Sequence, residues 1–357
     1  MGPIKRIEPV AGLPRYFMVD WMLHDRCTYD CSYCPPTNKA GSEDQLELGR
    51  LTEFRESVTN HARRQDPNTH MIAGFSGGEP TIWRGFEGLV DMLNDHGWHL
   101  LVTSNASRTP AWWARMAPKF AWICLSYHTE HADPDRFIDV VKATADHAPR
   151  SQINVSIMLN PDPKHFASAL AFGQRLESAV PRCGIHYQPI QLDFGLQTIN
   201  VADYTPEQRQ KMQSLVPRYG PELDDWMHDA RQSVHVTQGW RRLFSKETRQ
   251  ILDASWLVAQ GQNLFLGWEC RAGLDGVFVD ARGSVSLATC RVKGVIGTIQ
   301  DPEHIQWPTE AVTCPYNSCN CATDVRLGKS RVNTQKVKRI IPITYEPSLW
   351  TNPPQRA

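Results

Sequence analysis

Short apolar runs alternate with amphipathic stretches along the first 200 residues. The runs are rich in β-branched and aromatic residues, as expected for the strands of a buried parallel sheet. Repeated strand–helix units favour right-handed crossovers and, with six units, an open barrel rather than a closed one of eight. The predicted strands are "RYFMVDWML" (15–23), "THMIAGFS" (69–76), "HLLVTSNAS" (99–107), "AWICLSYH" (121–128), "INVSIMLN" (153–160) and "GIHYQPIQL" (184–192).

The stretches between these runs carry helix signals. In residues 85–97, Phe86, Leu89, Val90 and Leu93 have helical spacing. Gly97 then stands where a helix commonly ends in the left-handed conformation. A second helix is expected to start at Asp133 and Pro134, which suit an N-cap and a first turn.

The pattern changes after residue 200. Thr205, Pro206 and Gln208 form a capping-box signature, and a mostly helical region is expected from 201 to 262. "GVFVD" and "SVSLATC", on either side of "ARG", predict a hairpin within a small module at 263–330. Residues 331–357 are expected to be an irregular tail. The sequence thus predicts an α/β protein, a partial (β/α)6 TIM-like barrel over 1–200 followed by these three segments.

Bulk composition excludes several classes. Lys+Arg and Asp+Glu both number 38 among 357 residues, so no basic surface for nucleic acid or anionic lipid is expected. No apolar run approaches the roughly 18–20 residues of a membrane span, and the N-terminus lacks the apolar segment of a signal peptide. We therefore expect a soluble cytoplasmic protein that uses neither nucleic acid nor a membrane.

Eight of the ten cysteines fall into two groups, which indicates metal or iron–sulfur chemistry rather than disulfides in a reducing compartment. Cys27, Cys31 and Cys34 follow the first predicted strand. Three thiolates on such a loop can hold three corners of an iron–sulfur cube and leave the fourth iron open. A zinc site is the alternative. The remaining two cysteines, Cys124 and Cys183, are expected to be core residues.

The first group resembles the radical S-adenosylmethionine (SAM) superfamily. The C-x3-C-x2-C motif with Tyr33 before its last cysteine, "GGEP" after the second strand and "TSNAS" after the third carry the resemblance. It implies that SAM binds the open iron and is cleaved to a 5′-deoxyadenosyl radical, with an electron from a partner such as flavodoxin or ferredoxin. The residues it implies at the cofactor are Tyr33, Gly77, Gly78, Glu79, Pro80, Ser104, Asn105 and Ser126.

The second group resembles the SPASM or twitch extension, in which cysteines before and after a hairpin bind an auxiliary [4Fe–4S] cluster. Five cysteines suffice for one fully ligated cluster, and the sequence leaves open which four bind. A zinc ribbon is the alternative, and the cluster would either relay an electron or hold the module in place. The candidate ligands are Cys270, Cys290, Cys314, Cys319 and Cys321.

Polar residues at the carboxyl ends of strands are candidates to face a substrate. His128 and Asp193 are the candidate catalytic bases. The expected substrate is a small polar metabolite, a sugar, aminocyclitol, amino acid or nucleotide derivative, that is oxidised, epimerised or rearranged. The alternatives are a peptide-modifying maturase and a non-catalytic zinc or electron-transfer protein. The small molecule is favoured because the first strand starts too near the N-terminus to leave room for a peptide-recognition domain.

Overall fold

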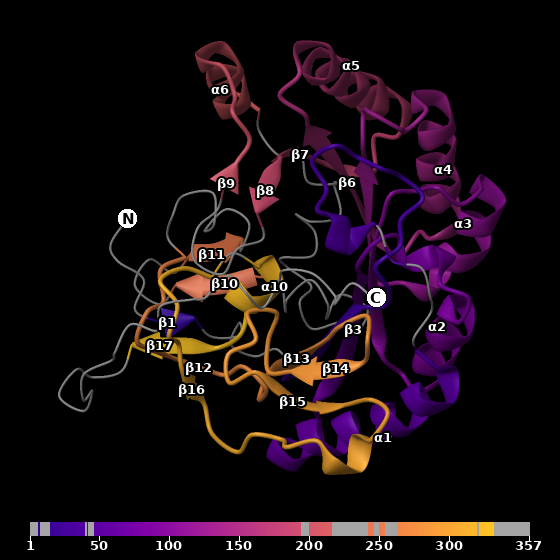
Figure 1. The fold of residues 1–357 in the computed structure, drawn as a ribbon. Coiled ribbons are helices and arrows are strands. Elements are labelled where there is room, and N and C mark those ends of the chain that lie inside the picture. Colours follow the sequence, from indigo (N-terminus) through magenta and orange to yellow (C-terminus); the bar gives the residue numbers. More distant parts are fainter. Residues whose placement is uncertain are drawn as a thin grey trace, which may run out of the picture.

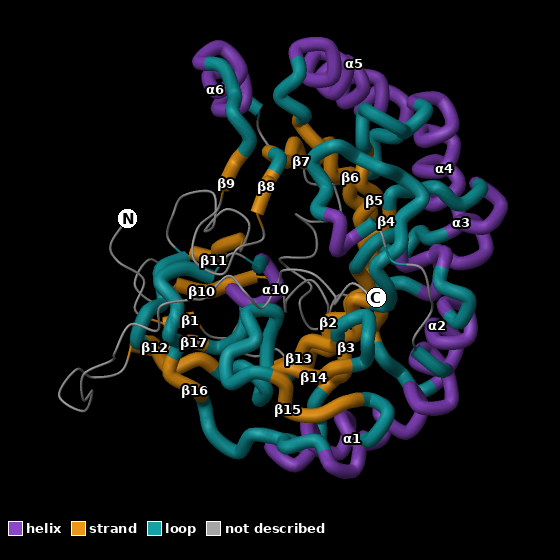
Figure 2. Tube along the Cα trace, in the orientation of Figure 1, coloured by secondary structure: helices purple, strands orange, loops and turns teal. Residues whose placement is uncertain are grey.

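The computed structural model describes residues 6–7, 15–39, 41, 46–193, 200–215, 242–245, 250–253, 263–319 and 321–331. Six consecutive parallel strands form one side of a nine-stranded sheet (Figures 1 and 2). Each predicted strand is present, so the partial-barrel prediction is confirmed. The six strands are β2 (Tyr16–Met22), β3 (His70–Ser76), β4 (His99–Ser104), β5 (Trp122–Tyr127), β6 (Gln152–Leu159) and β7 (Gly184–Pro189).

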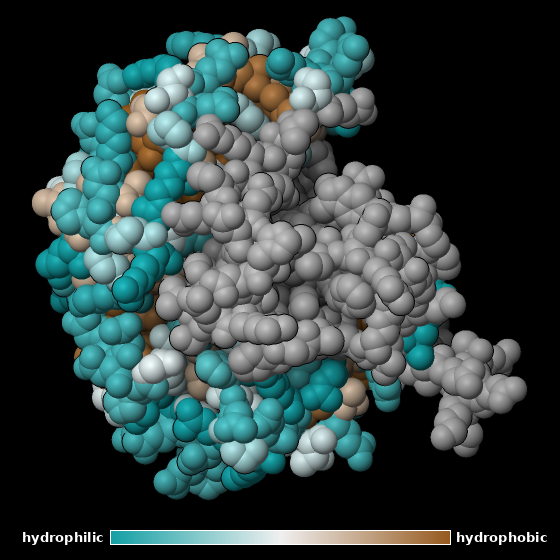
Figure 3. Space-filling model, turned by 180° about the vertical axis from the view of Figure 1, so that it is seen from behind, coloured by the Kyte–Doolittle hydropathy of each residue, from teal (hydrophilic) through white to brown (hydrophobic). Residues whose placement is uncertain are grey.

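A layer of helices covers the outer face of this sheet (Figure 1). Alternate strand residues such as Val19, Phe75 and Ile123 point into this layer and form the main buried core with helical residues such as Phe54 and Leu89. Seen from behind, the helical rim is mainly hydrophilic (Figure 3). The helices are α1 (Leu48–Gln65), α2 (Phe86–Asp95), α3 (Pro110–Met116), α4 (Pro134–His147) and α5 (Pro163–Ala179), with the 3-10 turns η1 (Pro36–Asn38), η2 (Pro80–Ile82) and η3 (Ala117–Lys119).

The predicted helix ends are confirmed. Gly97 follows α2 with a φ of 72° and donates its N–H to Asn94. The Asp133 side chain accepts the Arg136 N–H at the start of α4. Thr205 and Gln208 make a reciprocal capping box at the start of α6 (Pro206–Gln213).

The prediction of a mostly helical region over 201–262 is wrong for the described residues that follow α6 and its last turn. β10 (Arg242–Ser245) and β11 (Gln250–Asp253) form an antiparallel pair. "RLFS" and "QILD" are short apolar runs, for which helical and strand periodicity cannot be distinguished. The remainder of this region lies outside the described residues. A further pair joins β8 (Gln191–Asp193) to β9 (Asn200–Val201).

The C-terminal module continues the barrel sheet. The predicted hairpin is confirmed as β13 (Gly276–Val279) and β14 (Ser284–Ser286), and β13 lies parallel to β2. β15 (Val295–Thr298) completes the nine-stranded sheet, and η5 (Pro302–His304) follows it. The hairpin of the module is therefore part of the same sheet as the barrel strands.

A second sheet contains both ends of the described chain. Its order is β1-β17-β12-β16, so residues 6–7 pair with the last described strand. A short helix, α10 (Ala322–Val325), precedes that last strand. The members of the sheet are β1 (Arg6–Ile7), β12 (Trp268–Cys270), β16 (Val312–Thr313) and β17 (Lys329–Arg331). Within the described residues, no helix is both long and apolar enough to cross a membrane.

Candidate functional site

The first cysteine group lies on the loop that follows β2, at the carboxyl edge of the parallel strands. Cys31 is buried, whereas Cys27 and Cys34 are half-buried. Burial raises the pKa of all three thiols, that of Cys31 to about 12, and the charge of neighbouring cysteines adds to the shift for Cys31 and Cys34. The loop is shaped by two backbone contacts, Cys34 N–H to the Cys31 carbonyl at 3.1 Å and Tyr29 N–H to Cys27 Sγ at 3.4 Å. Binding of a positive metal centre would compensate the cost of forming these buried thiolates.

The glycines after β3 pack directly on the start of this loop. Gly78 donates its N–H to the His24 carbonyl at 3.0 Å, and Glu79 donates its N–H to the Arg26 carbonyl at 2.7 Å. A Cβ on Gly78 would lie only 1.7 Å from the Arg26 carbonyl oxygen, and Gly77 has a φ of 125°. Glycine is therefore required for this segment to approach the cysteine loop.

The Glu79 carboxylate is buried and accepts hydrogen bonds from four protein donors. One oxygen accepts the Thr81 N–H, the Thr81 hydroxyl and the Ser104 hydroxyl at 3.1, 2.6 and 2.8 Å. The other accepts the Asn105 N–H at 2.6 Å. Burial raises the pKa of Glu79, and these donors oppose that shift. The side chain therefore joins the end of β3 to the end of β4, and the buried Pro80 begins η2 beside it.

The "TSNAS" segment after β4 contacts the cysteine loop. The Asn105 amide donates to the Thr28 hydroxyl at 2.9 Å and lies 3.4 Å from Cys27 Sγ. Ala106 adopts a φ of 61°, the left-handed conformation that glycine occupies most easily. The three sequence motifs therefore meet at one edge of the sheet, with Asn105 bonded to both Glu79 and the cysteine loop.

The loop after β5 holds the cysteine loop from the other side. His128 Nδ1 lies 2.7 Å from the Tyr33 hydroxyl and 3.6 Å from Cys31 Sγ. Burial lowers the pKa of His128 to about 4, so the ring is neutral at pH 7. Glu130 accepts both the N–H and the hydroxyl of Ser32 at 2.7 and 2.6 Å.

These contacts place His128 against a candidate ligand loop, a different position from the substrate-facing base expected from the sequence. Asn160, which follows β6, donates a hydrogen bond to Glu130 at 2.6 Å, beside the contact of Glu130 with Ser32. Ser126 lies two residues before His128 on the inner face of β5, shared with Cys124 and half-buried. Asp193 lies in β8, and its side chain is outside the described part of the structure. Cys183 is fully buried in the main core, as predicted.

The five cysteines of the second group belong to the C-terminal module. Cys270, Cys314 and Cys319 are buried, and Cys290 and Cys321 are half-buried. Burial raises the pKa of Cys290, Cys314, Cys319 and Cys321, the last to about 12. Among the ten cysteines, all of which are described, no three sulfur atoms lie within 4.8 Å of one another.

Two buried charged residues accompany these cysteines, and the sequence analysis did not single them out. The Asp324 carboxylate accepts the N–H groups of Thr289 and Cys290 at 3.2 and 3.1 Å. Lys329 is directly opposite Cys270 in the β12–β17 pair and is 4% exposed. Lys329 and Cys270 are 59 positions apart in the sequence, and the pairing register of their strands brings them together. That register cannot be predicted from the residues around either position.

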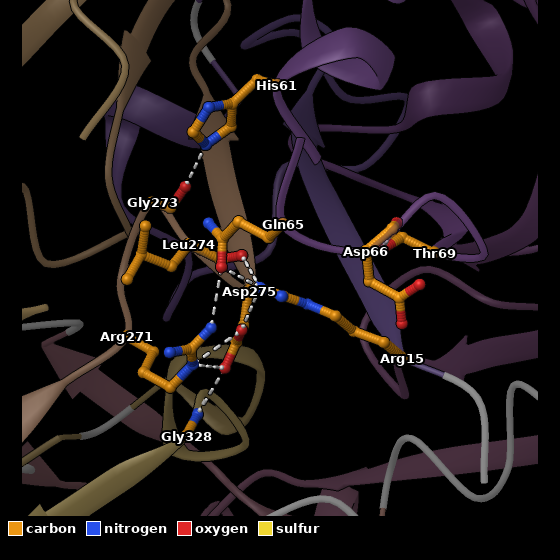
Figure 4. A network of polar contacts seen from close by, with 10 residues as sticks. All are labelled: Arg15, His61, Gln65, Asp66, Thr69, Arg271, Gly273, Leu274, Asp275 and Gly328. Atoms are coloured by element: carbon orange, nitrogen blue, oxygen red, sulfur yellow. Dashed lines mark hydrogen bonds and ion pairs between the residues drawn. The ribbon is translucent and has the colours of Figure 1, made fainter. Parts of the chain in front are cut away.

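A polar network connects the first cysteine segment of the module to the barrel (Figure 4). Asp275 accepts hydrogen bonds from Arg271 at 2.9 Å and from Arg15, the residue before β2, at 3.2 Å. Arg15 also donates to the Leu274 carbonyl at 2.9 Å. The ring of His61 on α1 lies 2.8 Å from the Gly273 carbonyl oxygen. These bonds position the residues that follow Cys270 against β2 and α1.

Comparison with solved structures identifies proteins of similar architecture. The structure of anSMEcpe with bound AdoMet and the Cp18Cys peptide aligns with a TM-score of 0.50 and 15% identity, over 81% of this chain and 78% of that chain. SuiB from Streptococcus suis bound to S-adenosylmethionine aligns with a TM-score of 0.45 and 12% identity, over 77% of this chain and 60% of that chain. No protein-family model and no curated protein matches the sequence. The chain therefore shares the fold of anSMEcpe, and in this chain the partial parallel barrel is followed by a C-terminal cysteine-rich module.

Proposed function

We propose that this protein is a radical SAM enzyme that removes a hydrogen atom from its substrate. The observation that carries the proposal is the position of Asn105. Its backbone bonds to Glu79 of the glycine-rich segment, and its side chain contacts Thr28 and Cys27 of the cysteine loop. One residue thus ties together the segments that would hold the cofactor and the cluster.

The residues present fit an iron–sulfur cluster better than a mononuclear zinc ion. Zinc with Zn–S bonds of about 2.3 Å holds thiolate sulfurs roughly 3.8 Å apart. No three cysteine sulfurs lie within 4.8 Å of one another, and the trio of possible ligand atoms found within that distance among the described residues contains one cysteine, Cys31, with Glu130 and His131. Three cysteines that do not all meet at one point suit ligands that bind different irons of a cube.

In the proposed site, Cys27, Cys31 and Cys34 hold the first cluster, and the open iron and SAM together supply the hydrogen-abstracting radical. The cofactor would lie along the edge formed by Gly77, Gly78, Glu79, Pro80, Ser104, Asn105 and Ser126, with Tyr33 beside the cluster loop.

His128 and Glu130 position the cysteine loop through Tyr33, Cys31 and Ser32. Asp193 remains a predicted base. The auxiliary cluster would take four thiolates from Cys270, Cys290, Cys314, Cys319 and Cys321.

We further propose a peptide as the substrate, in place of the small metabolite expected from the sequence. anSMEcpe aligns over most of both chains, and its structure contains a bound peptide, so this architecture accommodates one. Incubation with deuterated peptides and, separately, with deuterated small metabolites would decide between them. Transfer of deuterium to 5′-deoxyadenosine from the peptide pool alone is expected. Transfer from the metabolite pool alone would instead support a small polar metabolite as the substrate.

Anaerobic reconstitution tests the cofactor assignment. The wild-type protein is expected to bind about eight irons, as two cubes. Replacing Cys27, Cys31 and Cys34 together by Ala should remove half of the iron and abolish SAM cleavage. Cys183→Ala, which removes a fully buried core thiol outside both groups, is the matched control and should retain both. SAM cleavage by the triple variant would refute the assignment, as would zinc in place of iron in the wild type.

A further inference from the structure

We propose that Lys329 is a charge-compensating residue of the auxiliary cluster and raises its reduction potential. This inference rests on the auxiliary cluster of the proposed function. Its basis is the pairing of β12 with β17, in which Lys329 is directly opposite Cys270. Directly opposed residues in an antiparallel pair have Cβ atoms about 4.5–5.5 Å apart on the same face of the sheet. The lysine side chain therefore starts beside a candidate ligand.

The ammonium group of Lys329 is held inside the module. It donates hydrogen bonds to the carbonyls of Asp324 and of Leu327, the latter at 3.3 Å, and lies 5.2 Å from the centre of the Phe265 ring. A lysine with only 4% exposure is uncommon unless a negative charge accompanies it. The two backbone carbonyls accept hydrogen bonds from the ammonium group, but they carry no net negative charge.

The candidate ligands supply it. Cys270 lies directly opposite this buried lysine in the β12–β17 pair. As a thiolate ligand of a cluster, Cys270 would place negative charge beside the lysine. The Asp324 carboxylate accepts the N–H groups of Cys290 and Thr289. The module thus places a buried cation opposite Cys270 and a buried anion at the backbone of Cys290, two candidate ligands of the same cluster.

The effect on electron transfer follows from charge. A [4Fe–4S] cube with four thiolate ligands is an anion, and reduction adds one electron and one further negative charge. Charge and hydrogen bonds around a cluster set its potential. A fixed ammonium stabilises the reduced form more than the oxidised form, and a fixed carboxylate does the reverse. Removal of the two groups should therefore shift the potential in opposite directions.

The test uses the protein with Cys27, Cys31 and Cys34 replaced by Ala, so that only the auxiliary cluster is present. Potentials are measured by dithionite titration followed by electron paramagnetic resonance. Lys329→Met should reduce the equilibrium constant for reduction at least tenfold, which is about 59 mV for one electron. Lys329→Arg should retain most of the wild-type potential. Lys293→Met removes an exposed lysine of the same module and should change nothing.

Asp324→Asn provides the second arm, with an increase in potential as the expected result. If Lys329→Met loses the cluster, the shift in Asp324→Asn decides. A purely structural role would lower the cluster content of both variants without opposite shifts, and this result overturns the inference. If Lys329→Met and Lys293→Met have equal potentials and each binds four irons, the inference about Lys329 is refuted, but the proposed function is not. If the variant that lacks only Cys27, Cys31 and Cys34 binds no iron, the auxiliary cluster of the proposed function is refuted as well.

Discussion

At the scale of single residues, the candidate site depends on close contacts between the motifs. The glycine-rich segment touches the cysteine loop through backbone atoms, and Glu79 fills its hydrogen-bonding capacity with protein donors. Conformational demands and buried polar contacts of this kind make substitutions costly before any cofactor is bound.

Gly78→Ala is expected to displace the cysteine loop, because the new methyl group would overlap the Arg26 carbonyl. The cost should be about 3 kcal/mol, the upper end for overpacking, and the iron of the first site should be lost. Gly49→Ala on α1 is the matched control, since its Cβ meets nothing within 4 Å. That variant should gain about 0.5–1 kcal/mol. Urea unfolding and iron analysis of both proteins provide the measurement, and full iron in Gly78→Ala would contradict the packing argument.

Glu79→Gln is expected to destabilise even the cofactor-free protein. The amide group retains one acceptor oxygen and turns an NH2 toward donors, so the loss should be about 1–3 kcal/mol. The exposed Glu303→Gln should stay within about 0.5 kcal/mol. If Glu79 acts only on the cofactor, the two apo variants will unfold at the same urea concentration.

At the scale of elements, most contacts fix neighbouring strand–helix units to each other. Glu87 on α2 accepts the Trp112 indole N–H at 2.6 Å and two Arg115 bonds at 2.7 and 2.9 Å from α3. On the inner face of the sheet, Tyr16, Met18, Ile72 and Leu101 form a separate apolar cluster near the amino ends of the strands. This cluster leaves the carboxyl ends of the strands for the candidate site.

The α2–α3 contact predicts a dependence of stability on acid pH. The hydrogen bonds from Arg115 lower the pKa of Glu87 to about 2 from an ordinary value near 4.5. Because the folded-state pKa is depressed, the stabilisation is complete above about pH 4.5 and is lost as the pH falls toward 2. Glu87→Gln should be less stable at pH 6, and its difference from wild type should shrink toward pH 2. A difference that is independent of pH would exclude this linkage.

At the scale of the whole molecule, the module and the barrel form one structure. β13 pairs with β2 along Gly276–Val279, and the ring of Trp307 stacks on that of His61 of α1 at 4.5 Å. The Asp275 network adds polar contacts across the same junction (Figure 4). A sheet shared in this way should unfold cooperatively.

Asp275→Asn tests this junction. The Asp275 side chain is 13% exposed and is paired with Arg15 and Arg271, so its neutralisation should cost about 1–3 kcal/mol. We expect a single calorimetric transition in both wild type and variant, at a lower temperature in the variant. Asp301→Asn, at an exposed position, should leave the temperature unchanged. Two separate transitions in the wild type would show that the module folds independently.

The sequence by itself determined the local elements and the motifs. Strand runs, the Gly97 and Asp133 helix ends and the Thr205 capping box are legible because their signals lie within a few residues. The cysteine and "GGEP" motifs are also contained within a few residues. Their meeting at one edge could be predicted because parallel strands end on the same side of a sheet. Short apolar runs without such context were ambiguous, and the strands β10 (Arg242–Ser245) and β11 (Gln250–Asp253) were therefore missed.

Only the tertiary structure decided which distant segments meet. It placed β1 beside β17, β13 beside β2 and Lys329 opposite Cys270. It also directed Glu79 toward protein donors and His128 toward Tyr33 and Cys31. These outcomes depend on strand register and on side-chain packing across long loops. Neither leaves a periodic signal along the chain, because each is selected by the free energy of the assembled core rather than by local conformation.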